Sequence, residues 1–376
     1  MSARESDSIT IAGAGPAGLV SAIVLARAGR TVVVREWHES IGHRFHDDFQ
    51  GLENWSDERD VLEEMWSFGV AADFDSYPVK EGTVFDPKGR ARKVRSSRPL
   101  YYTVRRGSLP GTLDEGLLSQ ARRAGAEIRF GDKVQHLEGK GILAGGPRIA
   151  GAIAVGYVFE TDMADGDWFA LGNDLAPLGY AYLLVHGGRG TLATCLFTEF
   201  KHQAEYLKRT ARFFVEKAGL TMRVARPFGG FINVRVPRHA VQGGHPVIGE
   251  QAGFQDALAG FGLRYAMRSG ALAARSVIEG VSYERLWRQA LRPGLSAGVV
   301  NRMLFNALGE RGWQSAVNRL AAGDTGLVLR RFYGPSILSR VLFPMARRFY
   351  RRPLADPSCD HRDCQCVWCA CQAEQA

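Results

Sequence analysis

The pattern of apolar and polar positions predicts an α/β chain that opens with a β-α-β unit. Residues 9–12 and 31–34 form short apolar runs rich in β-branched side chains, and residues 17–26 place apolar side chains at helical spacing between them. This order implies two parallel strands joined by a right-handed crossover. Residues 39–77 lack such periodicity, so we expect loops there, with one helical stretch near 53–68.

In the middle of the chain the helical spacing gives way to alternation. Alternating runs with several aromatic residues lie at 154–160, 167–171, 180–186 and 191–197. Strict alternation over such short runs predicts an antiparallel sheet. Residues 282–349 then return to helical spacing, which predicts a mostly helical C-terminal region.

The turn between the first strand and the first helix carries a dinucleotide-binding fingerprint. The sequence Gly13-Ala14-Gly15-Pro16-Ala17-Gly18 matches G-x-G-x-x-G. Its glycines permit a tight turn, close approach of a pyrophosphate and tight packing of helix on strand, and the helix N-terminus offers N–H groups to phosphate. Glu36 follows the second strand, where an acidic side chain accepts hydrogen bonds from ribose hydroxyls. An acid there repels a 2′-phosphate, so FAD or NAD is favoured over NADP.

A second glycine-rich segment, residues 249–266, resembles a flavoprotein motif. The positions that match G-D-x-A-G-x-x-D-P-x-x-G-x-G-I are Gly249, Ala252, Gly253, Asp256, Gly260 and Gly262. This motif is typical of the geranylgeranyl reductase-like family of FAD-dependent oxidoreductases, which shares the para-hydroxybenzoate hydroxylase fold. Glu250 stands where the family has aspartate, and it keeps the charge. The resemblance implies that FAD contacts Gly249, Glu250, Gly260, Phe261 and Gly262.

Two further segments are similar to the same family. Pro177 and Tyr180 match the cavity motif P-x-x-Y-x-W-x-F-P, in which Tyr182 replaces tryptophan. The resemblance implies that Tyr180 and Tyr182 line the substrate cavity, where they are the candidate catalytic residues; an ordinary sheet core is the alternative. It also implies that Arg106 and Arg44 approach the flavin phosphates or ribityl chain, with solvated surface arginines as the alternative.

The resemblance covers about residues 8–280 and implies the fold class. We expect a Rossmann-like FAD-binding domain of the para-hydroxybenzoate hydroxylase type, with an inserted antiparallel β-sheet substrate domain and a C-terminal helical region. We assign residues 1–75, 100–148 and 237–280 to the discontinuous FAD-binding domain, 76–99 and 149–236 to the substrate-binding sheet domain, 281–355 to the helical region, and 356–376 to a cysteine-rich tail.

The positive charge is concentrated near the C-terminus. Of the formal net charge of +9, seven arginines between residues 330 and 352 supply +7, without an acidic residue among them. A nearly neutral remainder argues against nucleic-acid binding. Arginines interleaved with apolar residues are typical of an amphipathic helix at a membrane surface. The alternative is a helical layer packed on the FAD-binding domain. Without an apolar leader or spanning segment, we expect a cytoplasmic protein associated with the inner face of the membrane.

The tail concentrates five of the six cysteines of the chain. Cys364, Cys366, Cys369 and Cys371 lie close enough in sequence to hold Zn²⁺ or an iron–sulfur cluster as thiolates. Two alternatives remain open: a dithiol that passes electrons to the flavin, and a tail with reactive thiols.

Together these features predict an FAD-dependent oxidoreductase. The resemblance implies reduction of C=C bonds in an isoprenoid or other lipid-like apolar substrate, by hydride transfer from N5 of reduced flavin. NAD(P)H and a redox partner protein are the candidate electron donors. One alternative is a flavin-dependent monooxygenase acting on an apolar or aromatic substrate, although the family's Asp-Gly segment is replaced by residues 143–148. The other is a flavin-binding redox sensor or assembly protein that works through its cysteine tail.

Overall fold

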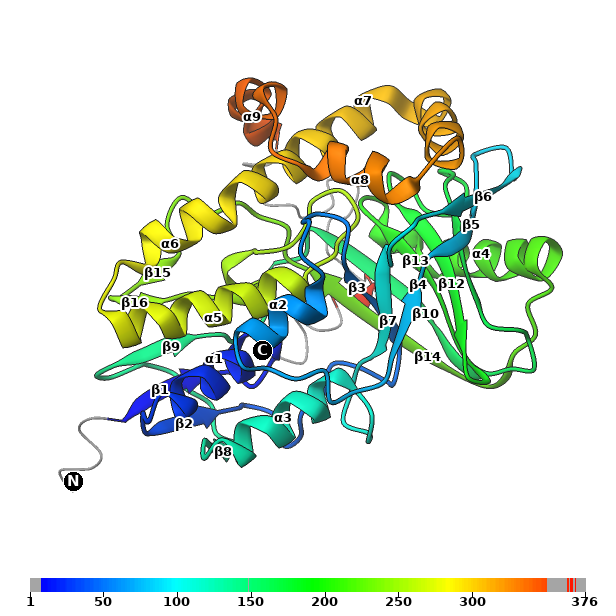
Figure 1. Ribbon diagram of the computed structural model, residues 1–376. Coiled ribbons are helices and arrows are strands. Elements are labelled where there is room, and N and C mark those ends of the chain that lie inside the picture. The colour runs from blue at the N-terminus through cyan, green and yellow to red at the C-terminus, as the bar shows by residue number, and fades with distance from the viewer. Residues whose placement is uncertain (1–7, 148, 350–363, 365, 368, 370–376) are drawn as a thin grey trace.

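A parallel four-stranded sheet organises the N-terminal part of the chain in the computed structural model (Figure 1), which describes residues 8–147, 149–349, 364, 366, 367 and 369. Its strand order is β8-β2-β1-β9, and every pairing in it is parallel. The strands are β1 (Ile9–Ala12), β2 (Val32–Arg35), β8 (Glu127–Arg129) and β9 (Gly141–Leu143). The predicted β-α-β unit is confirmed.

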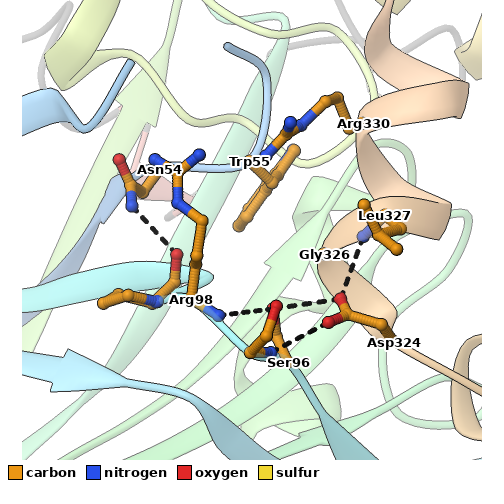
Figure 2. Close-up of a pocket in the computed structure, with 10 residues that line it drawn as sticks. Asn54, Trp55, Ser96, Arg98, Asp324, Gly326, Leu327 and Arg330 are labelled. Carbon is orange, nitrogen blue, oxygen red and sulfur yellow. Dashed lines mark hydrogen bonds between the residues drawn. The ribbon is translucent and has the colours of Figure 1, made fainter. Parts of the chain in front are cut away.

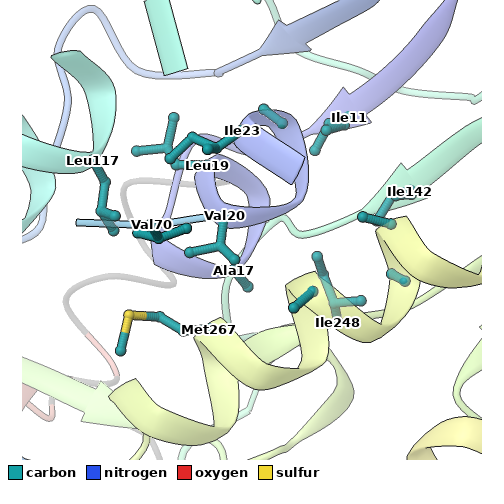
Figure 3. Close-up of a cluster of buried hydrophobic side chains, with 14 of the residues drawn as sticks. Ile11, Ala17, Leu19, Val20, Ile23, Val70, Leu117, Ile142, Ile248 and Met267 are labelled. Atoms are coloured by element: carbon teal, nitrogen blue, oxygen red, sulfur yellow. The ribbon is translucent and has the colours of Figure 1, made fainter. Parts of the chain in front are cut away.

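Helix α1 (Pro16–Arg27) lies at the centre of the main hydrophobic core. Leu19, Val20 and Ile23 are fully buried, and they share one cluster with residues of the sheet and of several other helices (Figure 3). Two of those helices, α3 (Leu113–Arg123) and α5 (Leu263–Glu279), pack directly on α1. Burial on all sides explains why α1 is apolar around its circumference rather than amphipathic.

Residues 39–77, which we expected to form loops and one helix, contain two strands. They are β3 (Phe49–Glu53) and β4 (Ser76–Val79). Both strands pair antiparallel with β7 (Tyr101–Arg105), which lies between them in a three-stranded sheet. The expected helix is shorter than predicted, as α2 (Val61–Ser67). The sequence of β3 has no β-branched residue, so tertiary pairing with β7 rather than local propensity makes it a strand.

The largest sheet has seven strands in the order β14-β10-β13-β12-β11-β5-β6. All its pairings are antiparallel except that of β11 with β5. The strands are β5 (Glu81–Phe85), β6 (Ala91–Arg95), β10 (Ala152–Glu160), β11 (Gly166–Ala170), β12 (Tyr180–His186), β13 (Arg189–Leu196) and β14 (Arg223–Ile232). The four alternating runs are therefore the predicted antiparallel strands, and the short helix η1 (Phe200–His202) leads into α4 (Gln203–Ala218), which packs on this sheet.

The C-terminal region is helical, as predicted. Its helices are α6 (Tyr283–Ala290), α7 (Arg292–Ala321), α8 (Thr325–Tyr333) and α9 (Ile337–Phe349). Helix α7 is interrupted at Gly309, whose φ of +59° is non-helical. Figure 1 shows α6 and α7 passing from the parallel-sheet side across to the large sheet, while α8 and α9 turn back along α7. A small ribbon of β15 (Val241–Gln242) and β16 (His245–Pro246) precedes the distal glycine-rich segment, which begins as the short helix η2 (Gly249–Ala252).

Helices α1 and α5 approach so closely that Gly270 has no room for a side chain. A Cβ at Gly270 would lie 2.2 Å from the carbonyl oxygen of Ala17, and the Ser21 hydroxyl donates to the carbonyl oxygen of Gly270 at 2.9 Å. We predict that Gly270→Ala destabilises the protein by about 1–3 kcal/mol through overpacking, although glycine-to-alanine in a helix normally gains about 1 kcal/mol. Urea denaturation measures whether the substitution lowers or raises the free energy of unfolding.

Gly230→Ala provides the control for this variant. A Cβ there would meet no atom within 4 Å, so we expect its unfolding midpoint to match or exceed the wild-type value. A Gly270→Ala protein as stable as the wild type would show that the two helices can separate at low cost.

Candidate active site

The turn after β1 has the geometry of a phosphate-binding loop. Gly13 has a φ of +112°, and a Cβ on it would lie 2.3 Å from the carbonyl oxygen of Ala144. Gly15 is the N-cap of α1, with Pro16 in the first turn, and a Cβ on Gly15 would meet no atom within 4 Å. Space therefore lies in front of the first N–H groups of α1, which have no acceptor inside the helix.

Glu36 lies beside this loop, as the sequence predicts. Its carboxylate accepts hydrogen bonds from the backbone N–H of Ala14 at 2.7 Å and of His38 at 3.1 Å. These bonds fix the acidic side chain at the end of β2, next to the glycine turn.

The second glycine-rich segment, residues 249–266, is called the distal segment below, and it packs directly on the start of α1. Gly249 has a φ of +58°, and a Cβ on it would lie 2.8 Å from that of Ala17. Its N–H donates to the Ser269 hydroxyl of α5 at 2.9 Å, and the N–H of Gly145 donates to the Gln251 side chain at 2.6 Å. The two glycine-rich segments, far apart in sequence, thus form one continuous surface.

Glu250 and Arg44 meet on this surface. A guanidinium nitrogen of Arg44 lies 3.1 Å from the Glu250 carboxylate, and another donates to the carbonyl oxygen of Phe231 at 3.1 Å. Asn233 donates to Glu250 through its backbone N–H and its side-chain amide. The side-chain oxygen of Asn233 is buried and has no hydrogen-bond partner in the described structure. A buried acceptor without a donor is costly in a folded protein, which fits a surface that receives a ligand.

Gly260, Phe261 and Gly262 form the turn that leads into α5. Gly260 has a φ of +74°, and its carbonyl oxygen accepts from the Gln255 side chain at 2.7 Å. The Gln255 side-chain oxygen is buried and unpaired among the described residues. Because α5 begins at Leu263 without a side-chain cap, its first N–H groups at the end of this turn have no acceptor inside the helix.

Arg106 is engaged by protein groups. Its guanidinium forms a bidentate ion pair with Asp114 at 2.8 and 2.9 Å, donates to Gln50 at 3.0 Å, and lies 3.9 Å from the ring centre of Phe45. Arg44 contacts the same ring at 5.5 Å. The two predicted arginines therefore flank Phe45, but of the two it is Arg44 that reaches the distal segment.

Tyr180 and Tyr182 belong to an aromatic layer between the large sheet and the Gly260 turn. The Tyr180 hydroxyl donates to the carbonyl oxygen of Ala259 at 2.5 Å, and the two tyrosine rings lie 6.2 Å apart. Phe169 packs against Tyr180, and Phe261 packs edge-on against Trp55. Tyr101 contacts both phenylalanines. Burial raises the pKa of both tyrosines well above the ordinary value, so they remain neutral phenols.

Sequence reasoning missed a buried polar layer under the distal segment. The carboxylate of Asp256 accepts from the N–H of Ala259 at 2.6 Å and from the Tyr333 hydroxyl at 3.4 Å. Arg302 of α7, which is 1% exposed, donates to the carbonyl oxygens of the neighbouring Ala257 and Leu258 and to that of Leu178 near β12. Helix α7 contains four arginines, and its sequence gives no signal that singles out Arg302.

A small pocket opens beside the aromatic layer, between the β6–β7 connection and α8 (Figure 2). Trp55, which forms its inner wall, contacts Phe261 edge-on at 4.7 Å and Tyr333 at 5.6 Å. Arg98 and Arg330 also line the pocket. The pocket therefore connects through Trp55 to the aromatic layer.

Of the four predicted metal ligands, Cys364, Cys366 and Cys369 lie together against the large sheet, and Cys371 lies outside the described residues. Of the arginine-rich segment, residues 330–349 are described, in α8 and α9. None of the described helices is long and apolar enough to cross a bilayer.

Comparison with known proteins shows which proteins the chain resembles. No protein-family model matches the chain. A digeranylgeranylglycerophospholipid reductase from Methanosphaerula palustris is 26% identical over 344 residues, covering 74% of this chain and 81% of that protein. A reductase of the same name from Methanosarcina mazei is 22% identical over 362 residues, covering 79% and 84%.

Solved structures share the fold. A geranylgeranyl bacteriochlorophyll reductase-like protein from Thermoplasma acidophilum has a TM-score of 0.70 at 16% identity, with 91% of this chain and 98% of that chain covered. A flavin-dependent brominase has a TM-score of 0.62 at 16% identity, covering 92% and 99%. The p-nitrophenol 4-monooxygenase of Pseudomonas putida has a TM-score of 0.57 at 15% identity, covering 88% and 100%.

The architecture is the para-hydroxybenzoate hydroxylase fold, which FAD-dependent oxidoreductases share. Within that fold, the chain is similar in sequence to the two named reductases.

Asp256 makes the stability of this site dependent on pH. Burial raises its pKa from the ordinary value of 3.8 to about 6, so the folded state binds the proton more tightly than the unfolded state. This contribution to stability is complete below pH 4 and is lost as pH rises through about 6. We predict that Asp256→Asn is more stable than the wild type by up to roughly 3 kcal/mol at pH 8, with the gain vanishing near pH 4.

Urea denaturation at pH 4, 6 and 8 measures the difference between the two proteins. Glu138→Gln, which removes an exposed carboxylate, is the control and should show a constant difference. An equal effect of Asp256→Asn at all three pH values would contradict the assignment.

Proposed function

We propose that the chain reduces C=C bonds of an isoprenoid or other lipid-like apolar substrate, with FAD held by the two glycine-rich segments. The observation that carries the proposal is the aromatic layer of Phe169, Tyr180 and Phe261, which lies between the large sheet and the turn into α5. An apolar chain packed against these rings would be shielded from water next to the flavin.

Each part of FAD has a suitable partner in this arrangement. The open N-terminus of α1 at Gly15 suits the pyrophosphate, and Glu36 suits the adenosine ribose. Glu250, with Arg44 beside it, suits the ribityl hydroxyls, and the N–H groups at Gly262 suit the oxygen-bearing edge of the flavin ring. When bound and reduced, FAD supplies a hydride from N5 to one alkene carbon.

The second alkene carbon requires a proton, and the neutral phenols of Tyr180 and Tyr182 are its proposed donors. Their raised pKa keeps the proton on oxygen at physiological pH. The bond from Tyr180 to the carbonyl oxygen of Ala259 orients this hydroxyl toward the distal segment. A phenol at that position can supply a proton while the surrounding rings exclude bulk water.

The pocket at Trp55 suits the polar end of such a substrate. The side-chain nitrogens of Trp55 and Arg330 include buried donors, Nε1 and Nε, without a partner in the described structure. Arg98 adds a second guanidinium at the rim. Guanidinium groups bind phosphate and carboxylate with directed hydrogen bonds, so an acidic headgroup fits here while its chain extends toward the aromatic layer.

Helices α8 and α9 provide the proposed contact with a membrane surface. Ile337 and Val341 are 81% and 68% exposed, and Leu338 and Met345 extend the same apolar face of α9. Arg340 and Arg348 lie exposed on this helix, and no acidic residue occurs between 325 and 349. An apolar face flanked by arginines fits anionic lipid. Because α8 also lines the Trp55 pocket, a lipid could pass from the bilayer to the site over a short path.

The first experiment tests cofactor and reaction together. We expect the purified protein to carry flavin absorption near 450 nm. After anaerobic reduction by NADH, NADPH or dithionite, we expect it to add H₂ to each double bond of an unsaturated isoprenoid lipid, as seen by mass spectrometry. A product that instead gains an oxygen atom when oxygen and NAD(P)H are supplied would establish the monooxygenase, which the fold shared with p-nitrophenol 4-monooxygenase makes the second candidate.

Glu36→Arg is the matched variant for this experiment. It places a cation where the ribose hydroxyls need an acceptor, so we expect protein purified without flavin and without turnover. Glu39→Arg makes the same charge change at an exposed position three residues away and should keep both. A fully flavinylated Glu36→Arg protein would contradict the binding mode.

The membrane contact yields a separate prediction. The double variant Arg340→Gln/Arg348→Gln removes two exposed charges that would each contribute roughly 1 kcal/mol with anionic lipid, so partitioning should weaken on the order of thirtyfold. Co-sedimentation with phosphatidylglycerol liposomes measures it. Lys208→Gln/Arg212→Gln removes the same charge from the exposed face of α4 and should leave partitioning nearly unchanged. Equal binding by all three proteins would exclude α9 as the contact.

A further inference from the structure

Three thiols of the C-terminal tail lie together in the described structure. The Sγ atoms of Cys364, Cys366 and Cys369 all lie within 4.8 Å of one another. In a tetrahedral thiolate site, Zn–S bonds of about 2.3 Å place neighbouring sulfurs about 3.8 Å apart, so binding would draw these sulfurs together by at most about 1 Å. We propose that the three cysteines bind one Zn²⁺ as thiolates and thereby fasten the tail to the large sheet.

The cluster is seated on the body of the protein. Cys366 is 1% exposed and belongs to the apolar cluster that contains Ile153 and Phe231, while Cys364 and Cys369 lie at the edge of that cluster. Val367 anchors the segment between them. Its N–H donates to the Gln203 side chain of α4 at 3.0 Å, and its side chain fills the space over Gly229 of β14, where a Cβ would lie 2.5 Å from Val367 Cγ2.

The donor set selects the metal. Zinc prefers sulfur and imidazole ligands in tetrahedral geometry, whereas calcium and magnesium require oxygen. Each cysteine gives up its thiol proton on binding, so one Zn²⁺ exchanges for three protons. The cation offsets two of the three resulting negative charges, which permits thiolates in an apolar setting that would otherwise disfavour them.

A dithiol that passes electrons to the flavin fits this arrangement less well. Such chemistry uses two accessible sulfurs, one of which is a reactive thiolate. Here three sulfurs converge, the middle one is buried, and no disulfide joins any of the described cysteines.

The site would stabilise a segment that also holds the predicted flavin surface. Phe231 packs against the cysteine cluster, and its carbonyl oxygen accepts from Arg44, which in turn pairs with Glu250. A metal bound by the tail would therefore fix the end of β14 in the position that orients Arg44. The zinc assignment itself does not depend on the proposed reaction.

The test measures metal in the full-length protein. Protein produced with zinc in the medium and then desalted should contain about one equivalent of zinc, and Cys366→Ser should reduce this at least tenfold. Cys195→Ala, which removes the buried cysteine of β13, should keep the full equivalent. X-ray absorption at the zinc edge should show sulfur neighbours at about 2.3 Å.

A second measurement covers the case in which Cys366→Ser fails to fold. Wild-type protein treated with N-ethylmaleimide should show Cys364 and Cys369 protected, and a chelator should make both reactive while releasing zinc. Three results would each overturn the proposal: wild-type protein that takes up no zinc on incubation, unchanged zinc in a folded Cys366→Ser protein, and iron with acid-labile sulfide in place of zinc.

Discussion

The close approach of the distal glycine-rich segment and of α5 to α1 is the constraint on which the site depends. Gly249 and Gly270 both face Ala17, and at each of them a side chain would collide with it. The absence of two Cβ atoms lets α5 and the distal segment lie directly on the helix whose N-terminus faces the phosphate-binding turn. Because this approach joins residues more than 200 positions apart, the parallel sheet, α1 and α5 must fold as one unit before the cofactor surface exists.

The parts of this architecture that repeat locally could be predicted from the sequence. The β-α-β unit, the helical C-terminal region and the alternating strands β10–β13 follow from periods of 3.6 and 2. Strand β3 could not be predicted, because Phe49–Glu53 contains a glycine and two polar residues and becomes a strand through its partner β7. Local patterns carry no information about pairing over such distances.

In the site, too, residues set by a local motif could be predicted, and residues set by long-range contacts could not. Gly13, Glu36 and Glu250 could be placed because each belongs to a motif in which spacing determines position. Arg106 could equally have been paired from sequence, since Asp114 lies in the first turn of the following helix, where an acid is favoured. Arg302 could not, because its three carbonyl acceptors come from two remote segments, and nothing in the composition of α7 indicates them.

Around the site, charged side chains are buried and large apolar side chains are exposed, and both departures from the usual arrangement are informative about function. Asp256 and Arg302 are buried beneath the distal segment, while Ile337 and Val341 are exposed on α9. Buried charge and exposed apolar area both cost stability, so each requires a compensating contact. Arg302 meets this cost through carbonyl bonds that hold the distal segment against the large sheet. The apolar face of α9 has no such compensation within the described chain, and a lipid surface next to an aromatic-lined site would provide it.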